Sequence, residues 1–523
     1  MPPRAAAEMT GVTGKRKREV ANGLPSAFKK AATGPAVNGK QKQRATVLDP
    51  KASKPKAPQA QATKKATKST NGVAKAPISQ DVSIQIVTGS YERVLHGFSA
   101  TIPSSRLTGE VAEKAEPVSY ADTFLFAAHA SSIRSLAISP ATASDKRFLA
   151  TGSSDERINL YSVSTVPPTK DRKQPAATLS STAVAENRSN QTLGSLIHHD
   201  RAVTSMHFPA KGKLFSGAED NTVGITRTRD WTLLSTLKAP IPKMQGRPSG
   251  DTAAPGEVPT GINDFAIHPS EKLMLSVSRG ERCMRLWNLM TGKKAGVLNF
   301  DRDTLAKVKE TKYSSGEGRR VLWDLAGQNY VVGFERGAVL FTMESEPVGF
   351  ITPSPPTKLH QMRYLLSSTG RSILAISTED GRILFYETTP TSAHSDGAIE
   401  TPQSPTCTFI AQLGGASAGV SGRIKDFEAI VLSTGDFVIV TASSDGAIRI
   451  WTLPKTDLDM PPDGDAKAES AKQVGKLIGT HETGNRITCL GAFVMDGNSG
   501  NTATDPDEAD VGSGESEGSD DEE

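Results

Sequence analysis

The chain has 523 residues and a formal charge of +4, but this charge is unevenly distributed along it. Residues 1–80 carry 17 Lys or Arg and three acids, whereas residues 496–523 carry 11 acids and no base. Both segments offer too little apolar surface to offset the entropy of ordering, so we expect a disordered basic tail and a disordered acidic tail. The part between them, residues 81–495, has a formal charge of about +1 and is long enough for one large domain or two smaller ones.

Composition also argues against several classes of protein. Cys283, Cys407 and Cys489 are isolated and form no CxxC pair, which favours reduced thiols in an intracellular protein without structural zinc. No apolar run reaches the length needed to span a membrane, and the N-terminus lacks the apolar core of a signal peptide. A basic start would suit a transit peptide, but its many Pro and Gly weaken any amphipathic helix.

The first distinct element along the chain is a compact basic cluster in the N-terminal tail, formed by Lys15, Arg16, Lys17 and Arg18. Such a cluster is typical of a nuclear import signal, and the lysines that follow it could contact RNA phosphates. The simpler alternative is a tail that only improves solubility.

Folded structure is expected from Val82 onward, as a series of short β-strands. Residues 84–98 predict two strands around Ser90-Tyr91-Glu92, and 124–129 predict a third. Six groups of four strands follow, with these ranges: 133–139, 148–152, 158–163 and 193–197; 203–208, 214–217, 223–226 and 233–237; 262–268, 273–277, 284–289 and 295–299; 321–326, 330–334, 338–343 and 349–351; 362–367, 373–377, 383–387 and 408–413; 424–432, 437–441, 447–453 and 474–478. A last strand, 487–493, stands alone.

One stretch, FVIVTASSDGAIRIWTL at 437–453, shows the repeat most clearly. Its Asp-Gly pair supports a tight hairpin turn between two strands whose residues alternate between apolar and polar. Related turns occur along the chain, as TGSYE at Thr88, TGSSD at Thr151, SGAED at Ser216, STEDG at Ser377 and TASSD at Thr441. A recurring unit of this kind predicts a repeat architecture.

The two ends of the folded part complete each other. The N-terminal pair of strands resembles the second and third strands of a unit that lacks its first strand, and 487–493 resembles a first strand with nothing after it. Joining them predicts a seventh, composite unit that closes a ring and removes open sheet edges. Polar insertions lengthen the repeat, and we expect them to be surface loops: 164–192, 239–259, 301–320, 388–405 and 454–472.

The units resemble the WD repeat of β-propellers, which implies an all-β, seven-bladed propeller spanning 82–495. The resemblance rests on LWN at 286–288 and IWT at 450–452, including Trp287 and Trp451, on His129 and His199 before first strands, and on turn acids at Asp155, Asp220, Asp380 and Asp445. In that family the turn Asp, the leading His, a Ser or Thr on the second strand and the Trp form a buried hydrogen-bonded set.

Carried over to this chain, the first complete unit would use His129, Ser153 and Asp155, with Tyr161 in place of the Trp. The second would use His199, Ser216 and Asp220, with Thr226 in place of the Trp. The unit with Trp451 has Asp445 but no leading His, and the third and fourth units lack both the His and the Asp. Incomplete networks of this kind predict that some blades are less rigid.

Within the WD-repeat proteins, the chain resembles the p21-activated protein kinase-interacting protein 1-like family. The most specific segments are VTGSYERVLHGF, starting at Val87, and RITCLGAF, starting at Arg486, which occur in register with weaker blade motifs between them. The resemblance implies assembly of the large (60S) ribosomal subunit, because the family's fungal members are assembly factors of that subunit. The tails differ from those of animal members, which carry a long basic C-terminal segment, so a role for the tails does not transfer.

The sequence shows no arrangement typical of a catalytic, cofactor or metal site. Its nine His are scattered, and the recurring acids lie in hairpin turns, where they have a structural role. The Gly-rich pieces at 414–415 and 419–422 lack the strand, helix and Lys of a phosphate-binding loop. We therefore expect a protein that is not an enzyme and has no cofactor, metal ion or small-molecule substrate.

Three functions remain open. The first is a scaffold in 60S subunit assembly and pre-rRNA processing, located in the nucleus and nucleolus, with pre-60S particles, other assembly factors and pre-rRNA as partners. The second is negative regulation of a p21-activated kinase by direct binding, and the third is a WD scaffold of another nuclear complex. None of the three involves a membrane. Ser519, which precedes Asp-Asp-Glu-Glu, is a candidate phosphorylation site in the acidic tail, although that tail could also serve solubility alone.

Overall fold

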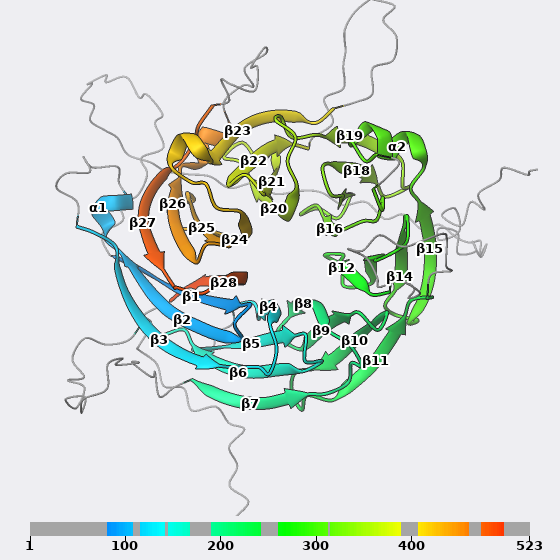
Figure 1. The fold of residues 1–523 in the computed structure, drawn as a ribbon, viewed down its shortest axis with the longest axis horizontal. Coiled ribbons are helices and arrows are strands. Elements are labelled where there is room, and N and C mark those ends of the chain that lie inside the picture. The colour runs from blue at the N-terminus through cyan, green and yellow to red at the C-terminus, as the bar shows by residue number, and fades with distance from the viewer. Residues whose placement is uncertain are drawn as a thin grey trace, which may run out of the picture. The chain divides into compact units, whose positions relative to one another are not determined.

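The computed structural model describes residues 81–107, 116–141, 145–167, 190–241, 260–311, 314–388, 406–459 and 472–495. In these ranges the chain forms seven four-stranded antiparallel sheets, all within one compact unit. The sheets are the blades of a β-propeller (Figure 1). The two predicted tails lie outside the described residues, as do most of the predicted insertions.

The blades are numbered here in chain order, and each is given from its innermost to its outermost strand. Blade 1 is β4 (Ile133–Ile138), β5 (Lys146–Ser153), β6 (Ile158–Ser164) and β7 (Gln191–Leu196); blade 2 is β8 (Val203–Ala210), β9 (Lys213–Ala218), β10 (Thr222–Arg227) and β11 (Leu233–Lys238); blade 3 is β12 (Ile262–Ile267), β13 (Leu273–Ser278), β14 (Cys283–Asn288) and β15 (Lys293–Asn299). Blade 4 is β16 (Arg320–Trp323), β17 (Asn329–Gly333), β18 (Ala338–Thr342) and β19 (Pro347–Ile351); blade 5 is β20 (Leu359–Leu366), β21 (Ser372–Thr378), β22 (Arg382–Glu387) and β23 (Thr408–Gly414); blade 6 is β24 (Ile424–Val431), β25 (Phe437–Ser443), β26 (Ala447–Leu453) and β27 (Lys476–Glu482). Blade 7 is β28 (Ile487–Val494), β1 (Val82–Ser90), β2 (Val94–Ile102) and β3 (Ser119–Ala127).

Blade 7 is built from both ends of the folded part, which confirms the predicted ring closure. Strand β28 pairs antiparallel with β1, from Ile84 opposite Val494 to Ser90 opposite Ile487. The first strands of neighbouring blades contact one another around the ring (Figure 1). A sheet closed in this way leaves no long unpaired edge at the junction of the two ends of the chain.

Two outer strands differ in position from the prediction. Strand β3 begins five residues before the predicted 124–129, and β27 extends four residues beyond the predicted 474–478. Both are outermost strands with most residues exposed or half-buried. Their polar residues hide the apolar alternation on which the prediction depends.

The hairpin turn of blade 6 shows why Asp-Gly occurs there. Gly446 has a φ of 94°, which L-residues with a side chain rarely adopt, and its N–H donates to the carbonyl of Ser443 (3.2 Å). The Asp445 carboxylate accepts a hydrogen bond from the N–H of Ala447 (3.0 Å). The two residues therefore close the turn together, as the sequence pattern predicted.

The hydrophobic core lies between the blades. The second and third strands are buried on both faces, so each blade packs against two neighbours. Phe385 of blade 5 and Phe427 and Trp451 of blade 6 share one cluster, whereas Phe98 of blade 7 and Ile448 of blade 6 share the next. Each large side chain buried in this way contributes roughly 1.5–3 kcal/mol, so the ring is stabilised mainly by contacts between blades.

One predicted surface loop, 301–320, is partly a core element. It contains the short helix α2 (Arg302–Lys307), whose N-terminus is capped by the Asp301 carboxylate at 2.9 Å from the N–H of Thr304. Leu305 and Val308 are buried against blades 3 and 4. The prediction of a simple surface loop was wrong here, because the polar composition of the segment concealed these two apolar anchors.

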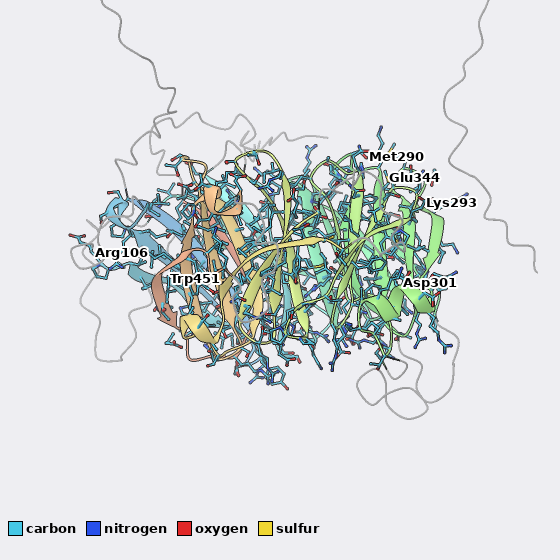
Figure 2. All side chains as sticks on the ribbon, turned by 90° about the horizontal axis from the view of Figure 1, so that it is seen from above. Arg106, Met290, Lys293, Asp301, Glu344 and Trp451 are labelled. Atoms are coloured by element: carbon cyan, nitrogen blue, oxygen red, sulfur yellow. The ribbon has the colours of Figure 1, made fainter. Side chains whose placement is uncertain are left out.

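The two sides of the propeller differ in what they expose. First strands begin next to the turns that join second and third strands, as Ile133 opposite Ser153 and Ile424 opposite Ser443 show. Figure 2 places Met290 and Glu344, from turns between third and fourth strands, on one side and Asp301 on the other. We call the side on which the first strands begin the entry face.

Candidate functional site

Blade 1 contains the first hydrogen-bonded set expected from the WD resemblance. His129 Nδ1 lies 3.1 Å from Asp155 Oδ2, and His129 Nε2 lies 2.8 Å from the hydroxyl of Thr151. Since a carboxylate only accepts, Nδ1–H donates to Asp155 and Nε2 accepts from Thr151. Ser153, the expected hydroxyl, instead donates to the carbonyl of Ser131 (3.1 Å). The expectation for Ser153 is corrected to Thr151, which lies on the same face of β5, one pleat further from the turn.

Blade 2 contains the second set and one residue that the sequence did not single out. His199 Nδ1 lies 3.0 Å from Asp220 Oδ2, and its Nε2 lies 2.8 Å from the hydroxyl of Ser216. His198 Nε2 also lies 3.0 Å from Ser216. The hydroxyl of Thr226, at the Trp position, has no partner among the described residues. His198 thus makes the contact with Ser216 that an indole N–H makes in other blades.

The two predicted Trp residues make that indole contact. Trp287 Nε1 donates to Ser276 (2.8 Å) in blade 3, and Trp451 Nε1 donates to Thr441 (3.3 Å) in blade 6. Trp451 lies inside the propeller, between blades (Figure 2). In both blades the Trp and the hydroxyl of the second strand remain although no leading His is present.

Among the remaining predicted residues, the turn acids Asp380 and Asp445 serve their own turns. Asp380 pairs with Arg382, with Oδ2 at 2.6 Å from Nη2, and Asp445 Oδ2 lies 3.7 Å from Arg449 Nη2. The predicted import signal, Lys15, Arg16, Lys17 and Arg18, and the candidate phosphorylation site Ser519 lie outside the described residues.

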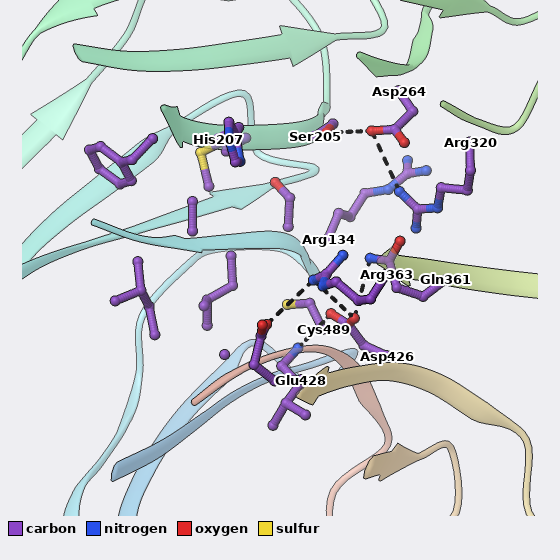
Figure 3. Close-up of a pocket in the computed structure, with 18 of the residues that line it drawn as sticks. Arg134, Ser205, His207, Asp264, Arg320, Gln361, Arg363, Asp426, Glu428 and Cys489 are labelled. Carbon is purple, nitrogen blue, oxygen red and sulfur yellow. Dashed lines mark hydrogen bonds and ion pairs between the residues drawn. The ribbon is translucent and has the colours of Figure 1, made fainter. Parts of the chain in front are cut away.

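A cavity of about 520 Å³ runs along the central channel, and the first strands line it (Figure 3). Ionisable groups inside it largely satisfy one another. Asp264 accepts from the hydroxyl of Ser205 (2.8 Å) and the N–H of Val321 (3.2 Å). Arg363 lies 3.9 Å from Asp426 and 3.4 Å from Glu428.

These groups are only partly buried, because part of their surface faces the channel. The side chains of Arg363 and Glu428 retain 31% and 30% of their exposure. Burial raises the pKa of Glu428, and neighbouring Asp426 adds to this effect while Arg363 opposes it. Because each acid has a nearby arginine or several hydrogen-bond donors, the interior of the channel has little unbalanced charge to offer a ligand.

The mouth of the channel on the entry face has a different charge balance. The residue that precedes the first strand is Lys358 in blade 5, Arg423 in blade 6 and Arg486 in blade 7, and Arg319 precedes β16 in blade 4. In blades 1 to 3 the corresponding residues are uncharged: Ser132, Ala202 and Gly261. Each of these seven positions is joined by a backbone hydrogen bond to the end of a second strand or the turn that follows it. The cations therefore gather on one half of the mouth.

Two further cations, Arg320 and Lys425, lie just inside this rim. Arg320 Nε donates to the carbonyl of His360 (3.0 Å). Lys425 has no carboxylate partner among the described residues. Burial, followed by the repulsion of Arg423, lowers the pKa of Lys425. Burial and the charges of Lys425 and Arg320 lower the pKa of His360 to about 3. These shifts indicate excess positive potential at this point.

The six cations of the rim have three acidic partners. Asp264 Oδ1 lies 3.8 Å from Arg320 Nη1. Glu335 pairs with Lys358 (2.9 Å) and Arg319 (3.2 Å), and Glu379 pairs with Arg423 (3.4 Å). We refer to Arg319, Arg320, Lys358, Arg423, Lys425 and Arg486 as the basic rim. Its excess charge and its position at the open end of a channel suit an anionic partner.

Comparison with known proteins agrees with the propeller architecture and with the His–Asp pairs of blades 1 and 2. The family model described as WD domain, G-beta repeat matches residues 122–162 and 190–225. These ranges contain the strands and turns that hold both His–Asp pairs of blades 1 and 2. The chain is a WD-repeat β-propeller.

Relatives of this WD-repeat propeller match it over most of its length. It is 25% identical over 427 residues to a protein of Danio rerio named p21-activated protein kinase-interacting protein 1-like, covering 82% of this chain and 84% of that protein. Protein MAK11 of Saccharomyces cerevisiae is 26% identical, covering 78% and 82%. Shk1 kinase-binding protein 15 of Schizosaccharomyces pombe is 24% identical, covering 80% and 86%. The resemblance stated from the sequence is confirmed.

Sequence reasoning missed the basic rim of the WD-repeat propeller. Its members are far apart in the chain, and each is a single cation beside an apolar strand. A signal was present, since Lys358, Arg423 and Arg486 all immediately precede a predicted or observed first strand. Within the described part of the propeller, no helix has the length and apolar character needed to cross a bilayer.

Proposed function

We propose that this chain is a non-enzymatic WD-repeat scaffold that supports assembly of the large ribosomal subunit and pre-rRNA processing. The family resemblance implies this role, and the relatives' names describe interacting proteins. A propeller suits it because a rigid ring presents loops on two faces and can hold several partners at once.

The observation that carries the proposal is the basic rim. A partner rich in phosphate would meet Lys358, Arg423 and Arg486 in succession on neighbouring blades. Lys425, which has no carboxylate partner within the described ranges, lies behind them. Lysine and arginine contacts to phosphates supply most of the sequence-independent affinity for nucleic acid. Because the propeller is otherwise close to neutral, this local excess of charge would orient it on a pre-rRNA surface.

The test is purification of the tagged protein from growing cells, followed by sedimentation on a sucrose gradient and sequencing of the bound RNA. A triple variant, Lys358→Ala, Arg423→Ala and Lys425→Ala, removes half of the rim. The matched control, Lys272→Ala, Lys293→Ala and Lys294→Ala, removes three exposed cations of blade 3 that are not part of the rim. Figure 2 places Lys293 on the side opposite Asp301. We expect the wild type and the control to migrate with large-subunit precursors, and the rim variant to shift toward free protein.

Migration of the wild type as a small complex without precursor RNA would contradict the proposal. If that complex contained a p21-activated kinase, regulation of the kinase would replace ribosome assembly as the proposed function. The names of the Danio rerio and Schizosaccharomyces pombe relatives, which describe kinase interaction, favour that candidate. In that case the function would be negative regulation of the kinase by binding.

The location of the protein in the cell distinguishes ribosome assembly, kinase regulation and a scaffold of another nuclear complex. We propose nuclear import through Lys15, Arg16, Lys17 and Arg18, followed by enrichment in the nucleolus. Changing these four residues to Ala in a fluorescent fusion should reduce nuclear accumulation, and unchanged accumulation would exclude them as the signal. Nucleoplasmic signal would favour a scaffold of another nuclear complex, and cytoplasmic or cortical signal would favour kinase regulation.

A further inference from the structure

Three side chains with metal-binding atoms converge at the junction of blades 6 and 7, away from the channel. They are His96 of β2, Asp122 of β3 and His481 of β27. One ligand atom from each lies within 4.8 Å of the other two, and His96 Nε2 lies 2.7 Å from Asp122 Oδ1. Two imidazoles and one carboxylate form a donor set that binds zinc and similar divalent metals in proteins.

Strand alternation directs these side chains to one place. His96 and Phe98 lie on the same face of β2, and Tyr120 and Asp122 lie on the same face of β3. That face packs against blade 6, where the ring of His481 stacks on Tyr120, with centroids 4.8 Å apart. His481 is also 4.5 Å from the Phe98 ring, so two aromatic rings set its position.

Two polar atoms in this cluster have no partner among the described residues: His96 Nδ1 and the Tyr120 hydroxyl. Both are buried, and a buried polar atom without a partner costs about 1–3 kcal/mol. Native structures rarely leave such atoms unsatisfied unless an ion or a water occupies the place beside them. The cluster therefore combines a converging donor set with unmet hydrogen-bonding capacity.

We propose that His96, Asp122 and His481 bind one divalent transition-metal ion, with Zn²⁺ as the best fit. Nitrogen donors disfavour Mg²⁺ and Ca²⁺, which prefer sites made of oxygen. In a tetrahedral zinc site, ligand atoms lie about 3.4 Å apart, so these atoms need to move by about 1 Å. Three protein ligands leave a fourth position open on the side of Asp122, whose side chain is 44% exposed.

The site lies between blades 6 and 7, so a bound metal ion would connect the two blades. His96 and Asp122 belong to blade 7, which joins both ends of the folded part, whereas His481 belongs to blade 6. A bound ion would link the closing blade to its neighbour and oppose opening of the ring. This inference departs from the sequence expectation of no metal site, because none of the three residues is near another in a recognisable ligand spacing.

The test uses the purified full-length chain, free of any polyhistidine tag and stripped of metal with a chelator. Zn²⁺ is added alone, bound metal is measured after equilibrium dialysis, and Co²⁺ is used as a spectroscopic substitute. We expect about one equivalent of Zn²⁺ per chain, a visible Co²⁺ spectrum of a site with few ligands, and a higher melting temperature with Zn²⁺.

Three variants and one control complete the design. His481→Gln and Asp122→Asn alter groups that are at least partly exposed, so they should fold even if His96→Gln does not. Each should weaken Zn²⁺ binding by about tenfold or more and abolish the thermal shift. His268→Gln, a histidine of blade 3, should bind Zn²⁺ like the wild type. Absence of stoichiometric binding by the wild type, or binding that survives His481→Gln, would overturn the proposal.

Discussion

At the scale of single residues, the propeller depends on small buried sets of polar groups. His129 and His199 each connect a turn acid to a hydroxyl of the second strand, and all three groups are buried or nearly so. Satisfied networks of this kind hold a turn against a strand, and each loses much of its value when one member is removed. Two consequences can be measured.

Thr151→Val should lower the free energy of unfolding by about 1–3 kcal/mol, because it leaves His129 Nε2 buried without a donor. Valine has nearly the same shape as threonine, so packing changes little. The measurement is urea unfolding, with Thr192→Val on the exposed outer strand β7 as the control. A cost for Thr151→Val within about 0.5 kcal/mol of the control would show that this hydroxyl does not support His129.

His198 makes stability depend on pH. Burial, reinforced by neighbouring His199, lowers its pKa to about 4. The unfolded chain takes up this proton near pH 6.5, so the neutral side chain stabilises the fold above that pH, and this contribution is lost as the pH falls toward 4.

His198→Gln should therefore show a smaller loss of unfolding free energy between pH 6.5 and 4 than the wild type, by up to about 3 kcal/mol. Unfolding measured by fluorescence across this range is the test, and the difference between the two proteins should be constant above about pH 7.5. Parallel curves down to pH 4 would show that the pKa of His198 is the same in the folded and unfolded chains, which would contradict the prediction.

At the scale of elements, glycines of the turn motifs set how closely blades approach. Gly89, Gly152 and Gly217 each precede the last residue of a second strand and face the first residues of the next blade. A Cβ on Gly152 would lie 2.6 Å from Val203 Cγ1 and 2.7 Å from Ser135 Oγ. Val203 is fully buried and stiff at χ1, so it has little freedom to move aside.

Gly152→Ala should accordingly destabilise the propeller by about 1–3 kcal/mol through overpacking between blades 1 and 2. Gly212→Ala is the matched control, because a Cβ there would meet nothing within 4 Å. Both are compared by urea unfolding. Equal stabilities of the two variants would mean that blades 1 and 2 separate easily enough to accept the methyl group.

At the scale of the whole molecule, the near-neutral propeller carries its excess charge on one half of one channel mouth. Charges inside the channel form pairs, as Arg363 does with Glu428 and Asp426. The basic rim has six cations and three acidic partners, which are Glu335, Glu379 and Asp264. A surface of this kind steers a polyanion toward one orientation, and its binding should weaken steeply with salt.

Affinity of the purified protein for a pre-rRNA fragment should follow this dependence. The plot of log affinity against log salt should be shallower by about 2–3 for the triple rim variant than for the wild type, because about one unit is lost per phosphate contact. The blade 3 triple variant should keep the wild-type slope. Identical slopes for the wild type and the rim variant in filter binding would show that RNA does not contact the rim.

The sequence by itself determined the number of blades and the closure of the ring. These follow from local signals, such as the alternation in 437–453, the turn motifs and the orphan first strand at 487–493, which each depend on neighbouring residues. It also identified most members of the blade networks. Thr151 was missed in favour of Ser153 because both hydroxyls lie on one face of β5, and only the position of His129 distinguishes them.

Only the tertiary structure decided what lies together between distant segments. The basic rim gathers residues from four blades, and the candidate metal site joins positions 96, 122 and 481 across a junction. His198 substitutes for a Trp because Gly224 leaves room for its ring beside Ser216. No local sequence pattern predicts these contacts between distant residues. They depend on how the blades pack into a ring rather than on the side-chain alternation of any one strand.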